Sequence, residues 1–309
     1  VNRSKIVNPN SMIEYVTPYF RPPSEAKSFI LQATIGCSHN QCTYCAMYRK
    51  DEQRFRVRPM DEIREIIDSA GERGEIGGRV FIADGNALVL AQKKLVGIIT
   101  HLRERSPHAP RVRMYANVGD ILRKGVDNLK ELRALGLDMV YIGFESGDDV
   151  VLERIKKGAG FEDTVKASRM LKEAGVMNSA MVLLGMGGVE RSAEHAEATG
   201  RLLTASDPEY VGALSLQVRP GAPLYDEWRR GEFTLPDKFR MIKELEILVE
   251  NTDLTDGRFF SNHISNYLPI KARFPGDKER VLTQIRAVLA AGDESLLRPD
   301  YYRDVINQY

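Results

Sequence analysis

Ile35-Gly36-Cys37-Ser38-His39-Asn40-Gln41-Cys42-Thr43-Tyr44-Cys45-Ala46-Met47-Tyr48-Arg49 holds every cysteine of the chain, at the spacing C-x4-C-x2-C. Thiolates bind soft metal centres, and an iron–sulfur cluster normally takes four of them. Because the chain has only three cysteines, a cluster bound here would leave one iron open to another ligand. This stretch therefore predicts an iron–sulfur centre with an open iron.

Zinc binding, a disulfide and chance each account less well for the three cysteines. A structural zinc site closed by His39 would use a single short ligand pair, whereas such sites usually combine two pairs from separate parts of a chain. A disulfide would leave one cysteine over. Three unrelated buried cysteines would not be expected within nine positions of a chain of 309 residues. The cluster is the favoured interpretation.

The cysteine stretch resembles the signature of the radical S-adenosylmethionine (radical SAM) superfamily, which is usually C-x3-C-x2-C with an aromatic residue before the last cysteine. Tyr44 fills the aromatic position, and the first gap is one residue longer here. The runs at 21–26 and 31–37 are similar to a subgroup described as coproporphyrinogen-oxidase-like or Elongator-like, whose members mostly have no assigned substrate. The resemblance extends over residues 20–225.

Composition describes an ordinary globular protein. The 44 basic and 43 acidic residues nearly cancel, so no global charge would recruit nucleic acid or an anionic membrane. No apolar run reaches the roughly 20 residues that span a bilayer. Thiols that stay reduced are typical of the cytoplasm, where we expect the protein to be located.

Strands and helices alternate along the chain, which predicts an α/β fold with a parallel sheet. The expected strands are 28–34, 79–83, 111–116, 138–144, 177–184 and 210–218, and the expected helices are 60–70, 93–105, 125–135, 162–174 and 192–205. No G-x-G-x-x-G follows the first strand, which argues against a dinucleotide fold. The resemblance implies a (β/α)6 partial TIM-type barrel over 28–225, with an N-terminal arm at 1–27 and a C-terminal helical extension at 226–309.

The resemblance also implies metal ligands and contacts to SAM at the carboxyl ends of the strands. Cys37, Cys42 and Cys45 are the expected ligands of a [4Fe-4S] cluster, and Tyr44 is an expected SAM contact. After the second strand, Asp84-Gly85-Asn86 stands where relatives have Gly-Gly-Glu against the methionine amino group. An ordinary Asp-Gly turn would explain the same residues.

The third and fourth strands end in further candidates. Asn117 would bind SAM or cap the turn that follows it. Relatives hold the ribose or amino acid part of SAM at the position of Glu145-Ser146. Lys157, twelve residues beyond Glu145, corresponds to a cation that meets the SAM carboxylate, with Lys156 and Arg154 as surface alternatives.

The last two strands supply the expected adenine contacts. Gly185-Met186 closes the fifth strand, where Met186 would cover the adenine ring, although a tight turn also explains the glycine. Relatives bind adenine through the backbone between Leu216 and Val218. Arg219 follows and would contact SAM or a substrate carboxylate.

The extension is expected to face the substrate. Its amphipathic stretch at 237–251 is read as a packing helix, and 277–291 with the tail to 309 as a lid or brace. Between them, 259–269 concentrates polar uncharged side chains among apolar neighbours. The candidates for substrate binding are Tyr115, Asn262 and Asn266, and those for a later proton transfer are His263 and Tyr267. Buried polar groups also stitch loops together, which leaves a structural role open.

These resemblances predict a radical SAM enzyme that reductively cleaves SAM to a 5′-deoxyadenosyl radical, which abstracts hydrogen from a small organic substrate under anaerobic conditions. An external one-electron reductant such as flavodoxin or ferredoxin would be its partner. With three cysteines in all, a second cluster is not expected. The alternatives are a non-catalytic iron–sulfur or zinc protein, acting as a sensor or electron carrier, and a plain barrel hydrolase or aldolase.

Overall fold

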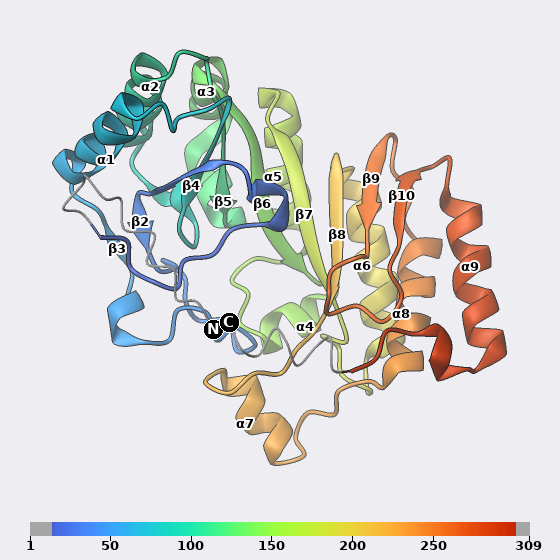
Figure 1. Cartoon of the computed structure of the whole chain (residues 1–309). Coiled ribbons are helices and arrows are strands. Elements are labelled where there is room, and N and C mark those ends of the chain that lie inside the picture. Colours follow the sequence, from blue (N-terminus) through green and yellow to red (C-terminus); the bar gives the residue numbers. More distant parts are fainter. Residues whose placement is uncertain (1–13, 301–309) are drawn as a thin grey trace. The chain divides into compact units, whose positions relative to one another are not determined.

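The computed structural model describes residues 14–300, so the ends of the predicted arm and tail, 1–13 and 301–309, lie outside it. Hydrogen bonding gives the strand order β1-β4-β5-β6-β7-β8-β9-β10 (Figure 1). The bounds are β1 (Phe29–Gln32), β4 (Arg79–Ala83), β5 (Arg111–Ala116), β6 (Leu137–Glu145), β7 (Met177–Leu184), β8 (Tyr210–Ser215), β9 (Gly257–Phe260) and β10 (Lys271–Phe274). Two short strands, β2 (Thr34–Ile35) and β3 (Arg56–Val57), pair separately.

Helices separate the parallel strands of the large sheet along the chain. They are α1 (Met60–Glu72), α2 (Gln92–Arg105), α3 (Val118–Leu135), α4 (Asp149–Arg154), α5 (Phe161–Ala174), α6 (Ser192–Ser206), α7 (Pro223–Arg229), α8 (Lys238–Glu250) and α9 (Lys278–Ala291). The predicted α/β class, with a parallel central sheet of the partial TIM-barrel type, is confirmed. The short helices α4 and α7 were not expected from the sequence.

The chain divides into two compact units. Of the described residues, the first comprises 14–40, 48–141 and 170–177, and the second 41–47, 142–169 and 178–300. In the first unit β1, β4 and β5 pair in parallel. Ile63, Ile66 and Ile67 recur at helical spacing on α1 and are all buried, which explains why this segment is a helix that packs on one side.

In the second unit β7, β8 and β9 are parallel and β10 is antiparallel to β9. Helix α8 packs against α6 and α9. Strands β9 and β10 were missed because each is four residues long and gives too short an alternating pattern to distinguish from a loop. The C-terminal extension is therefore part strand rather than wholly helical and irregular.

Within residues 14–300, no helix has both the length and the apolar character needed to cross a membrane.

Candidate functional site

Cys37 lies in the first unit, where other backbone segments pack closely against Gly36 and Gly85. Gly36 has φ +72°, and a Cβ built there would lie 2.1 Å from the carbonyl oxygen of Gln53. A Cβ on Gly85 would lie 2.3 Å from the carbonyl oxygen of Gly36 and 2.7 Å from Cα of Cys37. The backbone atoms that pack closely against Gly85 therefore belong to the cysteine loop itself.

Asn86 ties this part of the loop to helix α3. Its Oδ1 accepts a hydrogen bond from the Ser38 N–H at 2.9 Å, and its Nδ2 donates to Ser38 Oγ at 2.8 Å and to Asp120 Oδ2 at 2.7 Å. Asn86 is fully buried, so its amide positions the residue after Cys37. Asp120 was missed from the sequence, although its capping-box spacing with Asn117 was a signal.

Asn117 and Asp120 form a capping box at the start of α3. The Asn117 side chain accepts from the N–H of Asp120, and the Asp120 carboxylate accepts from the Asn117 N–H at 3.1 Å. Asn117 therefore has the capping role that the sequence left open. Tyr115, the predicted substrate contact on β5, packs edge-on against Phe81 and Tyr141, with ring centroids 5.2 and 6.0 Å away.

Hydrogen bonds from three residues of the chain fix the Asp84 carboxylate. Its Oδ1 accepts hydrogen bonds from the Tyr48 hydroxyl at 2.5 Å and from the N–H groups of Gly85 and Phe20 at 3.0 and 3.4 Å. Burial raises the pKa of the Asp84 carboxyl, while these hydrogen bonds oppose the rise. Tyr48, the missed partner, lies three residues beyond Cys45, so Asp84 fixes the end of the cysteine loop.

The remainder of the cysteine loop lies in the second unit. The Cys45 N–H donates to the Cys42 carbonyl oxygen at 3.2 Å, which closes a turn. Between them, the Thr43 N–H donates to the Ile155 carbonyl at 3.0 Å, and the Thr43 carbonyl accepts from the Leu224 N–H at 2.9 Å. The loop is thus anchored through its main chain.

Tyr44 connects the cysteine turn to a nearly buried ion pair. Lys157 Nζ lies 2.8 Å from Glu145 Oε1, and both side chains are nearly buried. Glu145 has φ +64°, an unusual backbone for a residue with a side chain. Burial, followed by the charges of Glu145, Cys42 and Cys45, raises the pKa of Tyr44, whose hydroxyl also hydrogen-bonds Glu145. Three residues predicted to contact SAM therefore meet in one cluster.

The donor chemistry fits an iron–sulfur cluster. All three cysteines are thiols rather than disulfides, and each is partly buried. Three thiolates are one short of the usual four, which leaves a coordination position for SAM. Within residues 14–300, no three His, Cys, Asp or Glu side chains already surround one point as metal ligands do.

Ser146 lies in a fully buried network rather than at an open surface. Its Oγ lies 2.8 Å from Nδ1 of His195 and accepts from the Asp148 N–H at 2.9 Å. Burial lowers the pKa of His195 to about 4. The imidazole is therefore neutral near pH 7, with Nε2 placed to donate to the Leu183 carbonyl at 3.0 Å. His195 was not predicted, because nothing in its local sequence distinguishes it.

The predicted adenine contacts lie around an apolar cluster of the second unit. Met186 and Leu216 are buried in it, and Val218 and Tyr44 pack against it. The Leu216 N–H already donates to the Leu184 carbonyl at 2.9 Å. Tyr44 from the cysteine loop therefore shares one apolar cluster with the ends of β7 and β8.

Glu244 of α8, another residue missed from the sequence, holds the turn at Gly185. Its Oε2 accepts from the Gly185 N–H at 2.5 Å and its Oε1 from Ser192 Oγ at 2.6 Å. Only 1% of Glu244 is exposed, and burial raises the pKa of its carboxyl to about 7.

This pKa predicts a pH-dependent stability. Between pH 4.5 and 7 the unfolded Glu244 loses its proton first, so the free energy of unfolding falls as pH rises, by roughly 3 kcal/mol in total. Glu244→Gln keeps both hydrogen bonds without the charge, so its urea midpoint should exceed that of the wild type at pH 8 and match it near pH 4.5. Parallel stability curves for the two proteins would show that Glu244 does not titrate in this range.

The polar residues predicted to face the substrate differ in their surroundings: one is buried and fully hydrogen-bonded, and others are partly exposed. Asn266 is 2% exposed, and its amide donates to the Ala213 carbonyl and Ser261 Oγ and accepts from the Ser215 N–H and Ser265 Oγ. This exhausts the capacity of an amide, so Asn266 stitches β8 to the segment after β9. Asn262, His263 and Arg219 keep some exposure, while Tyr267 is buried.

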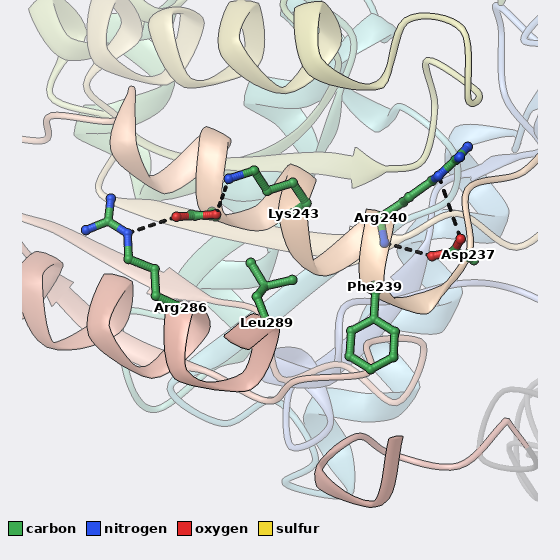
Figure 2. Close-up of a pocket in the computed structure, with 7 residues that line it drawn as sticks. Asp237, Phe239, Arg240, Lys243, Arg286 and Leu289 are labelled. Atoms are coloured by element: carbon green, nitrogen blue, oxygen red, sulfur yellow. Dashed lines mark hydrogen bonds and ion pairs between the residues drawn. The ribbon is translucent and has the colours of Figure 1, made fainter. Parts of the chain in front are cut away.

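A shallow pocket of about 430 Å³ lies elsewhere, between α8 and α9 (Figure 2). Its charged side chains neutralise one another, because Glu246 binds Lys243 at 2.6 Å and Arg286 at 2.8 Å. None of the residues predicted for the site lines it.

Comparison with known proteins identifies the family. A model of the radical SAM superfamily matches residues 31–203. The heme chaperone HemW of Bacillus subtilis strain 168 is 23% identical over 227 residues, which are 70% of this chain and 58% of the relative. The chain thus spans little more than half the length of this curated relative.

Two solved structures share the fold. The cobalamin-dependent radical SAM enzyme OxsB with SAM bound has a TM-score of 0.55 at 16% identity, covering 74% of this chain and 41% of that one. The methyltransferase TsrM of Kitasatospora setae, with cobalamin and a [4Fe-4S] cluster, has a TM-score of 0.51 at 21% identity, covering 64% and 38%.

The family match covers more than half of the chain and includes all three cysteines. The narrower subgroup stays a prediction. The predicted cofactors, a [4Fe-4S] cluster and SAM, are those of the matched family. The chain therefore belongs to the radical SAM superfamily.

Proposed function

We propose that this protein cleaves SAM reductively and uses the product radical to abstract hydrogen from a small organic substrate. The observation that carries the proposal is the contact series from the cysteine turn through Tyr44 to Glu145 and Lys157. It joins the stretch that would hold the cluster to a carboxylate and an ammonium suited to the two charged ends of an amino acid. When bound, the reduced cluster and SAM together supply methionine and a 5′-deoxyadenosyl radical.

The residues of this chain would bind and orient the cluster and SAM. Cys37, Cys42 and Cys45 would hold the cluster. Glu145 would meet the amino group or ribose of SAM, and Lys157 its carboxylate. Of the other predicted contacts, Met186 lies in the apolar cluster suited to adenine and Val218 packs against it, while Arg219 would meet a carboxylate of SAM or of the substrate.

Other predicted residues would hold the cysteine loop and neighbouring backbone in position. Asp84, Gly85, Asn86 and Asn117 would fix the cysteine loop and the helix behind it, as their hydrogen bonds and close packing indicate. Ser146 and Gly185 would shape the backbone at the ends of β6 and β7. On the substrate side, Tyr115 and Asn262 would contact the substrate, and His263 or Tyr267 would transfer a later proton.

The test is 5′-deoxyadenosine formation by anaerobically reconstituted protein given SAM and dithionite. The product should accumulate with time and protein concentration, and deuterium from the correct labelled substrate should enter it. A fully loaded cluster that neither binds nor cleaves SAM would contradict the proposal and favour the sensor or electron carrier. Flavodoxin or ferredoxin should replace dithionite, as expected for an anaerobic, cytoplasmic enzyme.

A further inference from the structure

Two arginines of the second unit, Arg219 after β8 and Arg298 after α9, are partly buried and lack an opposing charge among residues 14–300. Arg219, four residues past the end of β8, is partly buried, and its Nη2 donates to the neutral Gln217 Oε1 at 2.7 Å. Arg298 donates from Nη1 to the backbone carbonyls of His263 and Asn262 at 2.8 and 3.3 Å. Among residues 14–300, no carboxylate forms an ion pair with either guanidinium group.

Other partly buried cations of the same unit are neutralised. Lys157 binds Glu145 at 2.8 Å, and Arg191 binds Asp148 at 2.8 Å. A charge that is partly removed from water without a counter-ion is costly. An anion that arrived at Arg219 and Arg298 would remove this cost.

His263 lies within electrostatic reach of both arginines. Burial lowers the pKa of its imidazole, and the charges of Arg219 and Arg298 lower it further. These two guanidinium groups are the charges that act on the ring, and its Nδ1 lies 2.8 Å from Ser265 Oγ. Both arginines therefore lie near His263, and we name these two residues the Arg219–Arg298 pair.

An apolar surface follows the same two strands toward this pair. On β8, Gly212 pairs with Met181 of β7 and with Phe260 of β9, and Leu214 pairs with Leu183. These five residues alternate with buried neighbours and keep some exposure, so they share one face of the sheet. Along β8 and β9 this face leads toward the carboxyl ends, where Arg219 and His263 follow.

Gly212 has room for a Cβ on this apolar face. A Cβ built there would meet Leu214 Cδ1 at 3.6 Å, the Ala180 carbonyl at 3.9 Å and Met181 Cγ at 4.0 Å, which are ordinary contacts. A side chain at position 212 would therefore fill space above the sheet without displacing the backbone.

We propose that the substrate is an apolar molecule that carries a carboxylate, with its carboxylate bound by the Arg219–Arg298 pair and its hydrocarbon part on the face of Met181, Gly212, Leu214 and Phe260. This rests on the proposed function, whose substrate it specifies. Guanidinium groups bind any oxyanion, whereas the apolar face selects a hydrocarbon body over a small inorganic anion.

The test follows the His263 imidazole by NMR in cluster-loaded protein without reductant, with His263→Gln to assign its signal among the five histidines. The probes are acetate, butanoate, hexanoate, octanoate and inorganic phosphate. A bound carboxylate should raise the pKa of His263 by roughly one unit. Each added methylene that reaches the apolar face should tighten binding by up to about fourfold.

Variants separate the two parts of the site. Arg219→Gln should abolish the response to every acid, whereas Arg201→Gln, which removes an exposed arginine paired with Glu197, should leave it intact. Gly212→Leu should keep the response to acetate but lose the gain with chain length. Gly212→Ala, a smaller change, should show an intermediate loss.

Each contrary result overturns the proposal. Phosphate binding tighter than octanoate would contradict an apolar acid, and an unchanged response in Arg219→Gln would remove the anion site. If SAM alone raises the His263 pKa and displaces octanoate, the site belongs to the cofactor. None of these readouts needs SAM cleavage, so a failure here is distinct from a failure of the proposed function.

Discussion

Replacing Cys42 with alanine should leave the protein folded but unable to hold its cluster, and 5′-deoxyadenosine formation should fall to the level of a protein-free control. The expectation follows from thiolate count, because the chain has no fourth cysteine to take over. Iron and labile sulfide measured after anaerobic reconstitution check the loss of the cluster. Cys37→Ala and Cys45→Ala should behave in the same way.

Thr43→Val is the matched control for Cys42→Ala, because the two residues are adjacent. The Thr43 hydroxyl is buried and, among residues 14–300, has no hydrogen-bond partner. Valine has the same shape, and the anchoring contacts of Thr43 use only its main chain, so iron content and activity should stay at the wild-type level. Loss of the cluster in Thr43→Val, or its retention in Cys42→Ala, would contradict the assignment.

Gly85→Ala should both destabilise the protein and impair cluster loading. The added methyl group would lie 2.3 Å from the Gly36 carbonyl oxygen and 2.7 Å from Cα of Cys37, and these backbone atoms cannot rotate away. Gly85 also has φ +23°, which disfavours a side chain. We expect a loss of about 2–4 kcal/mol in the free energy of unfolding, measured with urea on the cluster-free protein.

The control for Gly85→Ala is Gly119→Ala in α3. Nothing lies within 4 Å of a Cβ built at Gly119, and alanine favours a helix, so this variant should gain up to about 1 kcal/mol. Iron content should fall in Gly85→Ala and not in Gly119→Ala. Equal stability and iron content in the two variants would show that the backbone at Gly85 does not constrain the cysteine loop.

Features encoded within one short segment were predictable. The isoleucines of α1 repeat with helical spacing, and the spacing of the cysteines predicts a cluster site, so both were read from neighbouring residues. Strands β9 and β10 could not be predicted in this way, because a strand of four residues shows too little periodicity. The assignment of β9 depends on pairing with β8, which is distant in the sequence, and β10 in turn pairs with β9.

The same limit explains the site residues that were missed. Glu244 reaches Gly185 across 59 residues, and His195 reaches Ser146 across 49. Asn86 was expected to contact SAM, yet its hydrogen bonds go to Ser38 and Asp120. Local sequence shows that such a residue is polar, but only the fold determines which partner its side chain meets.

The main-chain anchoring of the cysteine turn has a consequence for sequence divergence. The contacts of Thr43 with Ile155 and Leu224 use N–H and carbonyl groups, which nearly every amino acid supplies. Side chains at these three positions can drift over evolutionary time without releasing the turn. A one-residue insertion between Cys42 and Cys45 would instead move one of the two cysteines away from the anchored Thr43, so selection here should act on the spacing of the cysteines more strongly than on the identity of Thr43.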